Sequence, residues 1–420
     1  MFNKISVIGM GYIGLPTAAM FASKGISVLG IDIKEEAVNL INEGKIHIIE
    51  AGLEEIVKNA VEAGHLSASL TAEASDAFLI AVPTPLRYNK TNIPEPDLDF
   101  IKSAAESIAP FLKRDNLVIL ESTSPVGATE ILCDWLAEMR PDLTFPNSQN
   151  FLNPDINIAY CPERVLPGNV IYELENNDRV IGGMTEKCSA RSKELYEIFV
   201  KGSCIITNAR TAEMSKLTEN SARDVQIAFA NELSMICESE GINVWELISL
   251  ANRHPRVNIL EPGPGVGGHC IAVDPWFIVS RNIESSKLIH TARLVNDSKP
   301  EWVVKKFHEV IKSFKQDNPM VSKNDIKVAC YGLAFKPDID DLRESPSLEI
   351  AKKINSIHSG EVLCVEPNIE DNKSCKELNL TTFDYAKENA QVHLLLVDHK
   401  EFRSSKVSTK YLIDTKGIWL

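Results

Sequence analysis

Three glycines near the N-terminus constrain the fold of this chain more than any other sequence feature. Gly9, Gly11 and Gly14 follow a short apolar run at residues 4–9, which we expect to be a strand, and open an alanine-rich segment at 12–24, which we expect to be a helix. Gly9 permits a tight turn, Gly11 lets a pyrophosphate approach the backbone, and Gly14 lets the helix pack closely on the strand. The pattern therefore predicts a dinucleotide site at the start of a doubly wound α/β sheet, although a merely tight turn has the same glycines.

Asp32 strengthens this interpretation. It ends a second apolar run at 26–32, 18 residues after Gly14, and completes a strand-helix-strand unit. A carboxylate at that place accepts hydrogen bonds from a ribose hydroxyl and repels a 2′-phosphate. The sequence therefore predicts that the dinucleotide is NAD and not NADP.

The rest of the chain divides into a long α/β start, a helical middle and a shorter α/β end. Residues 211–240 contain no glycine and no proline, which predicts one long helix ended by Gly241. The polar stretch 313–325 reads as a linker. We expect an NAD-binding domain at 1–204, a central helical domain at 205–314 and a second Rossmann-like domain at 315–420. The expected strands lie at 77–82, 117–121, 156–160, 179–183, 326–332, 361–365, 392–397 and 411–414, with helices at 243–252, 285–314 and 345–356.

Composition narrows the class of protein. The chain has 58 acidic and 44 basic residues, a formal charge of −14 that argues against a nucleic-acid or anionic-membrane partner. No stretch has the roughly 20 consecutive apolar residues of a membrane span. The nine cysteines are scattered, odd in number and without a CxxC pair, so we expect no disulfide framework and no metal site, and a cytoplasmic location.

Cys270 stands apart from the other cysteines. It ends the segment EPGPGVGGHC, and glycines without side chains leave room for a ligand to reach its thiol. A helix beginning there would favour a thiolate, and Asp274 would then lie on the same face. Cys204, Cys330 and Cys364 lie in apolar runs and are expected to be buried bystanders.

Further polar residues follow strands or share a helix face. Lys216, Asn220 and Arg223 are spaced to lie on one side of the long helix, where a lysine and an asparagine can hold a developing oxyanion; the alternative is a solvated face. The remaining candidates follow expected strands or sit in Gly/Pro-bounded loops, where they either meet a ligand or only shape turns: Thr84, Thr123, Glu163, Arg164, His254, Arg256, Lys336 and Arg343.

A nicotinamide site combined with a thiol nucleophile indicates a particular reaction. Hydride transfer alone needs no cysteine, but oxidation of an alcohol to an acid benefits from one. After the first hydride loss the thiolate traps the aldehyde as a thiohemiacetal, and the second hydride loss gives a thioester that water releases. This chemistry consumes two NAD+ per acid.

The motifs GxGYIGLP, AVPTP, ESTSPVG, GVGGHCIAVDP and GLAFKPDIDDLRES resemble the nucleotide-sugar 6-dehydrogenases of the UDP-glucose/GDP-mannose dehydrogenase family, in order along essentially the whole chain. Within that family, YCPERVLPG at 160–168, NRHPRVNIL and the IDTKGIW ending are most similar to the branch that oxidises UDP-N-acetyl-D-mannosamine. The resemblance implies two Rossmann-like domains joined by a long central helix and a helical dimerisation core. It also implies UDP-N-acetyl-D-mannosaminuronate as product, a precursor of surface polysaccharide such as enterobacterial common antigen or capsule.

By position, the resemblance assigns roles to single residues. Cys270 would be the nucleophile and Lys216 the proton donor and acceptor, with Asn220 at the oxyanion, Asp274 assisting and Glu163 helping to hydrolyse the thioester. The NAD contacts would be Gly9, Gly11, Tyr12, Ile13, Gly14, Asp32, Thr84, Thr123 and, across a homodimer, Arg343. The UDP-sugar contacts would be Glu163, Arg164, Lys216, Asn220, Arg223, His254, Arg256, Gly267, Phe335, Lys336 and Lys416.

Three rival functions remain open at this point. A sibling enzyme would perform the same reaction on UDP-glucose or UDP-N-acetylglucosamine. A lysine-dependent β-hydroxyacid dehydrogenase would use no thiol and consume one NAD+ per turnover. A non-enzymatic NAD-binding scaffold would bind the cofactor without turning over any UDP-sugar.

Overall fold

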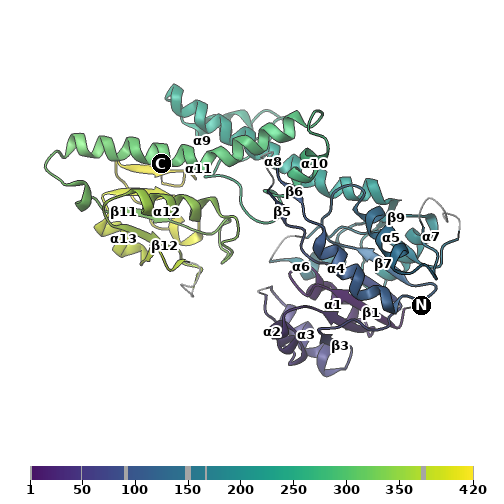
Figure 1. Cartoon of the computed structure of the whole chain (residues 1–420). Helices are drawn as coiled ribbons and strands as arrows, with labels where there is room; N and C mark the ends of the chain where they lie inside the picture. Colours follow the sequence, from purple (N-terminus) through teal and green to yellow (C-terminus); the bar gives the residue numbers. More distant parts are fainter. Residues whose placement is uncertain are drawn as a thin grey trace. The chain divides into compact units, whose positions relative to one another are not determined.

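The computed structural model describes residues 2–48, 50–88, 93–146, 153–165, 168–369 and 375–419. The chain forms two compact units (Figure 1). The first comprises Met1–Glu219 with Trp276–Ser280, and the second comprises Asn220–Pro275 with Arg281–Leu420. Each unit contains one doubly wound sheet, which confirms the expected α/β class. No helix among the described residues has both the length and the apolar character needed to cross a membrane.

The sheet of the first unit has eight strands in the order β10-β9-β8-β7-β4-β1-β2-β3. Every neighbouring pair is parallel except β8 with β9, which is antiparallel. The strands are β1 (Lys4–Ile8), β2 (Ser27–Ile31), β3 (Leu66–Ser69), β4 (Ala77–Ile80), β7 (Leu117–Leu120), β8 (Asn157–Tyr160), β9 (Arg179–Gly183) and β10 (Cys204–Asn208). A separate hairpin pairs β5 (Leu86–Arg87) with β6 (Glu95–Pro96).

Six of these strands fall where the apolar runs predict them, and two do not. β3 reads Leu-Ser-Ala-Ser, too polar to stand out as an apolar run. β10 is an edge strand whose residues are half-buried or exposed, so it lacks the hydrophobic continuity of a central strand. Both are strands because an adjacent strand supplies their hydrogen bonds, β2 for β3 and β9 for β10. The local sequence pattern does not reveal that pairing.

Helices cover both faces of this first sheet, because alternate residues of each strand point to opposite sides. Ile5 and Val7 of β1 face a core with α1 and α3, whereas Ile8 faces a core with α4 and α5. The helices of the unit are α1 (Gly14–Ser23), α2 (Glu35–Asn42), α3 (Leu53–Glu62), α4 (Asp99–Ile108), α5 (Ala128–Met139), α6 (Val170–Asn176) and α7 (Glu186–Tyr196), with a short 3-10 turn at Ala109–Phe111.

The helical middle contains four helices. They are α8 (Ala209–Glu240), α9 (Val244–Ala251), α10 (Asp274–Arg281) and α11 (Lys287–Asp317). The long segment without glycine or proline is a single helix, as predicted. Gly241 follows it with φ +68°, a left-handed conformation suited to glycine. The expected linker at 313–325 is wrong in its first part, because α11 continues to Asp317. A polar composition suits a solvated helix end as well as a loop.

The second unit carries a five-stranded parallel sheet in the order β13-β12-β11-β14-β15. Its elements are a 3-10 turn at Lys323–Asp325, β11 (Val328–Tyr331), α12 (Pro346–Ile357), β12 (Val362–Val365), β13 (Asn379–Leu380), α13 (Phe383–Asn389), β14 (Val392–Leu395), α14 (Lys400–Arg403) and β15 (Leu412–Asp414). Figure 1 shows α11 running alongside this sheet. The strand order 3-2-1-4-5 is the order that β3, β2, β1, β4 and β7 adopt in the first sheet, so the two sheets share one topology.

Candidate active site

The glycine turn between β1 and α1 has the shape that a dinucleotide requires. Gly9 has φ +92°, and its N–H donates to the carbonyl of Ile31 at 2.8 Å. A Cβ on Gly14 would lie 1.8 Å from the Gly9 carbonyl oxygen, so only glycine allows α1 to start there. A Cβ on Gly11 would meet nothing within 4 Å. The turn therefore keeps open space over Gly11, in front of the positive N-terminal end of α1, where a pyrophosphate fits.

Asp32 is oriented by the backbone of the same turn. Its Oδ2 accepts the Met10 N–H at 2.9 Å, and its Oδ1 accepts the Lys34 N–H at 2.9 Å. Each oxygen keeps further acceptor capacity, which suits a ribose diol. Tyr12 is 38% exposed and Ile13 is half-buried at the start of α1, so both lie beside this open space.

The two threonines at strand ends lie together, as the sheet order predicts. Thr84 follows β4 and Thr123 follows β7, and these strands are neighbours. The Thr84 hydroxyl donates to the Thr123 carbonyl at 2.5 Å. This contact joins two loops at the carboxyl edge of the sheet, where doubly wound folds bind their ligands.

Glu163 and Lys216 are both buried in the first unit. Both residues are 8% exposed. Burial raises the pKa of Glu163, while the Lys216 ammonium and the Val165 N–H that donates to its carboxylate pull that pKa back down. Arg164 points elsewhere and pairs with Glu219 at 2.7 Å. Leu166 and Pro167 of the same sequence motif lie outside the described residues.

Sequence reasoning missed the charges packed behind Glu163. Arg179 on β9 contacts Glu121 at 2.7 Å, and both side chains are at most 5% exposed. The Tyr196 hydroxyl donates to the same Glu121 oxygen at 2.5 Å, and the guanidinium lies 4.3 Å from the Tyr196 ring. Glu121 opens the ESTSPVG motif, but nothing local marks it as buried or indicates its distant partners.

The second unit holds the cysteine with two of its predicted companions. Cys270 is exposed, whereas seven of the other eight cysteines are buried and Cys204 is half-buried. Asn220 on α8 donates to Asp274 at 2.5 Å, and the Asp274 N–H donates to the Cys270 carbonyl at 2.8 Å. The condition that a helix begins at Cys270 is not met: a turn at 271–273 precedes α10, which begins at Asp274. The thiol therefore lies one turn before the helix and not in its first turn.

The glycines before Cys270 have a role that the sequence does not reveal. A Cβ on Gly267 would lie 2.4 Å from the Glu344 carbonyl oxygen and 2.8 Å from Phe335 Cβ. Gly268 has φ +82° and would meet the Phe335 ring at 2.9 Å, while its N–H donates to the Arg343 carbonyl at 3.3 Å. The space that we expected for a ligand at these glycines is taken by the loop after β11. The cysteine segment and that loop are therefore one packed structure.

The remaining basic candidates of the second unit lie at its surface. Arg223, His254, Arg256 and Lys336 are exposed. Arg343 pairs with Asp341 at 2.5 Å, and the Lys416 ammonium lies 3.6 Å from buried Asp398. Phe335 is half-buried against the cysteine segment. Phe335, Lys336 and Arg343 thus come from the loop after β11, and Lys416 comes from the end of β15.

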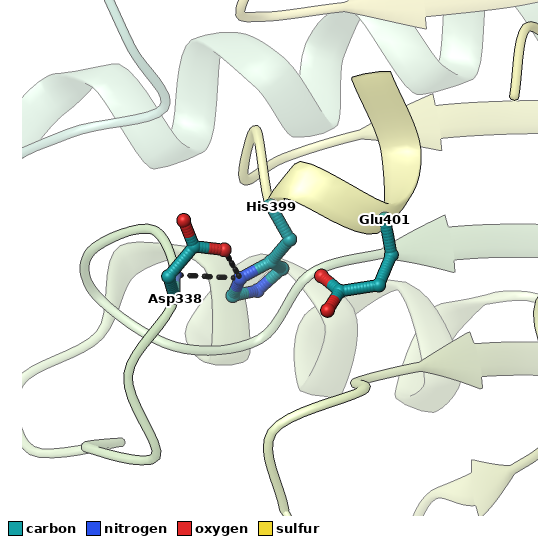
Figure 2. A group of neighbouring side chains, drawn as sticks. All are labelled: Asp338, His399 and Glu401. Carbon is teal, nitrogen blue, oxygen red and sulfur yellow. Dashed lines mark hydrogen bonds and ion pairs between the residues drawn. The ribbon is translucent and has the colours of Figure 1, made fainter. Parts of the chain in front are cut away.

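Asp338, His399 and Glu401 lie close enough to resemble a metal site (Figure 2). Nδ1 of His399 accepts the Asp338 backbone N–H at 2.9 Å, so that nitrogen carries no proton, and Asn368 Nδ2 contacts it at 3.0 Å. Nε2 then donates to Glu366 at 3.1 Å. Both ring nitrogens are engaged, and this pattern favours a structural histidine over a metal ligand.

Three domains of one protein family match successive parts of the chain. Its NAD binding domain matches residues 3–200, its central domain residues 210–298, and its UDP binding domain residues 329–420. The chain belongs to the UDP-glucose/GDP-mannose dehydrogenase family. It is an NAD-dependent nucleotide-sugar dehydrogenase with Rossmann-like NAD-binding and UDP-binding domains.

Relatives with narrower names align along the full chain. The UDP-N-acetyl-D-mannosamine dehydrogenase of Yersinia pestis is 60% identical over 100% of this chain and 99% of its own length. The NDP-N-acetyl-D-galactosaminuronic acid dehydrogenase of Ralstonia nicotianae is 55% identical over 100% of this chain and 96% of its own. The solved UDP-N-acetyl-mannosamine dehydrogenase of Staphylococcus aureus has a TM-score of 0.83 and 42% identity, covering 99% of this chain and 95% of that one.

Proposed function

We propose that the enzyme oxidises UDP-N-acetyl-D-mannosamine to UDP-N-acetyl-D-mannosaminuronate. The overall change converts one primary alcohol, one water and two NAD+ into one carboxylate, two NADH and three protons. Exposed Cys270 carries the proposal, because a thiol at the surface of an NAD-dependent dehydrogenase supplies the covalent step that a four-electron oxidation needs. The identity of 60% with the Yersinia relative supports this choice of sugar.

The residues that would hold the cofactor fit it. The open space over Gly11, the carboxylate of Asp32 and the paired Thr84 and Thr123 suit a pyrophosphate, an adenosine ribose and the nicotinamide half. Bound NAD+ supplies the acceptor for each hydride. Gly9 and Gly14 shape the turn, and Tyr12 and Ile13 flank it. In this proposal Arg343 contacts the cofactor of a partner subunit.

The thiol and its companions have distinct roles. Cys270 Sγ adds to the aldehyde carbon and forms a thiohemiacetal, and loss of the second hydride makes a thioester. Lys216 takes the alcohol proton and returns a proton to the oxyanion, while the Asn220 amide donates to that oxygen. Asp274 orients Asn220 through their 2.5 Å hydrogen bond.

Glu163 suits the final hydrolysis. Water attacks the thioester carbon, the carboxylate accepts a proton from that water, and the C–S bond breaks to regenerate the Cys270 thiolate. Burial raises the pKa of Glu163 and thereby makes the carboxylate a stronger base than a solvated one. The positive charge of Lys216 opposes that rise.

Substrate binding is proposed for the exposed cations and the loop after β11. Lys336 and Lys416 suit the diphosphate, and Phe335 suits the uracil or sugar face. The other contacts proposed are Glu163, Arg164, Lys216, Asn220, Arg223, His254, Arg256 and Gly267. The domain division at 204/205 and 314/315, a cytoplasmic location and a role in surface polysaccharide synthesis belong to the same proposal.

A homodimer is also part of the proposal. Phe229 and Ile236 on α8 are half-exposed and seven residues apart, so they lie on one helix face, and Leu288 and Leu294 of α11 are exposed too. Apolar side chains of this size on helices indicate a covered surface. Light scattering should give a dimer mass that Ile236→Glu reduces to a monomer. Met320→Glu, at a 95% exposed apolar position after α11, is the matched control and should stay dimeric.

One assay tests the reaction. Purified enzyme is incubated with NAD+ and UDP-N-acetyl-D-mannosamine, and NADH formed is counted against uronic acid formed. A ratio of two is expected. NADH formed without any uronic acid would indicate a single two-electron oxidation, as in a lysine-dependent hydroxyacid dehydrogenase, and NADH binding without turnover would indicate a scaffold.

Substrate competition and one pair of variants complete the test. The 55% identical Ralstonia relative makes the N-acetylgalactosamine nucleotide the first competitor to include, with UDP-glucose and UDP-N-acetylglucosamine beside it. The mannosamine substrate should have the highest kcat/KM, and a higher value for a competitor would overturn the choice of sugar.

Cys270→Ala should abolish acid formation, whereas Cys330→Ala, which removes a buried thiol, should keep it.

A further inference from the structure

Glu213 is a fully buried carboxylate for which the mechanism above has no use. It lies on α8, three residues before Lys216, and is 0% exposed. Within the described residues it takes part in no ion pair. Burial raises the pKa of Glu213, and three donors that face its oxygens oppose that rise. A buried carboxylate without a cation is costly, so its place in the fold needs an explanation.

The three donors belong to the beginning of α5. The Gly127 N–H donates to Oε2 at 2.6 Å, and the Thr129 N–H and hydroxyl donate to Oε1 at 2.8 Å and 2.6 Å. Gly127 occupies the N-cap position with φ +91° and has no side chain to cap the helix. Glu213 therefore supplies the missing cap from a different element, and the positive end of α5 stabilises its charge.

This cap joins two parts of the active site. Gly127 ends the loop after β7, and this loop contains Thr123, whose carbonyl accepts the Thr84 hydroxyl in the proposed NAD site. Glu213 and Lys216 are three residues apart on one helix, so they share a face and move together. Both partners of the cap lie in the first unit, and the link joins the loop after β7 to the turn of α8 that carries Lys216.

We propose that Glu213 is a positioning residue that fixes the Lys216 turn of α8 relative to the Thr123 loop of the NAD site. The inference rests on the proposed function for the meaning of Lys216 and Thr123. Hydride transfer and proton transfer must occur on the same alcohol, so the lysine and the nicotinamide end of the site need a fixed separation. Displacements of about 1 Å at such a site reduce rates by roughly a hundredfold.

A second link between the same helices provides the matched control. Arg210 on α8 pairs with Glu130 on α5 at 2.5 Å, and this ion pair is exposed. If α8 and α5 needed only to be held together, loss of either link would lower stability in the same way. The exposed pair caps no N–H group and touches neither Lys216 nor the Thr123 loop through hydrogen bonds.

The test compares Glu213→Gln with Glu130→Gln. Gln keeps the volume and one acceptor oxygen, but its NH₂ group faces the donors on the other side, so part of the cap is lost. In Glu213→Gln we expect kcat to fall about thirtyfold, the NADH Kd to rise about threefold, and the Gly127 and Thr129 amides to exchange hydrogen faster. Glu130→Gln should leave all three unchanged. Thr129→Ser should keep wild-type kcat, and Thr129→Val should lose part of it.

A folded Glu213→Gln enzyme with kcat, NADH Kd and amide exchange within twofold of wild type would overturn the proposal. A lower melting temperature with unchanged kcat at 25 °C would reduce Glu213 to a stabilising anchor and would also overturn it. If wild-type enzyme turns over no UDP-sugar, the proposed function fails separately. The NADH Kd and the amide exchange then decide the role of Glu213 without any turnover.

Discussion

The two sheets of this enzyme begin with the same turn but use it differently. Gly9 after β1 and Gly332 after β11 have φ +92° and +86°, and each N–H donates at 2.8 Å to the carbonyl that ends the adjacent strand, Ile31 or Val365. The strand orders around them also agree. Two copies of one turn in two sheets of one topology indicate an internal duplication.

The two turns differ in the residues that follow Gly9 and Gly332. α1 begins at Gly14, five residues after Gly9, whereas α12 begins only at Pro346, after a long loop from Gly332. The first turn therefore presents a helix N-terminus and empty space over Gly11 to a pyrophosphate. The second turn has no helix end there, and we propose that its nucleotide is bound by side chains of the loop, such as Phe335 and Lys336.

The acidic residues that end the second strand of each sheet differ in the same way. Asp32 is half-buried and accepts one backbone N–H on each oxygen. Glu366 is buried, and one of its oxygens accepts the Leu333 N–H, the Ala334 N–H and the His399 ring proton. The first carboxylate remains available to a ligand, whereas the hydrogen-bonding capacity of the second is used to hold the loop after β11. The same fold therefore has an open carboxylate in one unit and a structural carboxylate in the other.

The largest effect that tests this comparison comes from the glycines. Gly11→Ala should fold normally, because its Cβ meets nothing within 4 Å, yet the methyl group occupies the approach of the pyrophosphate. We expect the NADH Kd to rise about a hundredfold (about 2.7 kcal/mol), with an unchanged melting temperature. Fluorescence titration and thermal unfolding measure the two quantities.

Gly332→Ala is the matched variant in the second turn. Its Cβ would lie 2.4 Å from Val397 Cβ, and its φ of +86° disfavours alanine. Here we expect the opposite result, a lower melting temperature with an NADH Kd within twofold of wild type. If Gly332→Ala weakens NADH binding as much as Gly11→Ala does, the functional distinction between the turns is wrong.

A smaller effect is expected from the two carboxylates. Asp32→Asn removes the negative charge that repels a 2′-phosphate, so the preference for NAD over NADP, measured as a ratio of kcat/KM, should shrink about tenfold (about 1.4 kcal/mol). Glu366→Gln should leave that ratio unchanged and lower stability by about 1–3 kcal/mol, because a buried backbone donor loses its acceptor. A change of cofactor preference in Glu366→Gln would contradict the separation of roles.

The last effect concerns acid stability of the second unit and leaves activity at pH 7 untouched. Burial lowers the pKa of His393 to about 4, and its ring contacts the Tyr331 hydroxyl at 3.0 Å and the Ala390 carbonyl at 3.1 Å. The unfolded chain takes up this proton near pH 6.5 and the folded chain only near pH 4. Stability should therefore fall as pH drops from 6.5 to 4, by at most about 1.4 kcal/mol per pH unit.

Denaturant unfolding at several pH values checks this expectation. His393→Gln should flatten the dependence between pH 6.5 and 4. His47→Gln, at an exposed histidine of the first unit, should leave it as in wild type. Equal slopes in wild type and His393→Gln would show that another group controls acid stability.

Much of the fold was predictable because the signals are local. Short stretches of neighbouring residues carry these signals: the apolar runs of β1, β2, β4, β7 and β8, and the absence of glycine and proline from most of α8. β3 and β10 escaped prediction because a polar or edge strand is defined by its neighbour. Among the candidate site residues, Cys270 was recognisable from its glycine-rich context, whereas buried Glu121 and Glu213 carry no local mark that distinguishes them from solvated glutamates.

The sequence by itself determined the cofactor turn and the likeness to the family, and it predicted Cys270 as the nucleophile, since each rests on residue types at short spacing. Tertiary structure decided which groups act together. Gly267 and Gly268 leave room for the loop after β11, and Glu213 caps a helix that starts 85 residues earlier in the chain. The physical reason is that packing and hydrogen bonding depend on distance in space. When the contacting residues are far apart in sequence, no local sequence pattern reveals the contact.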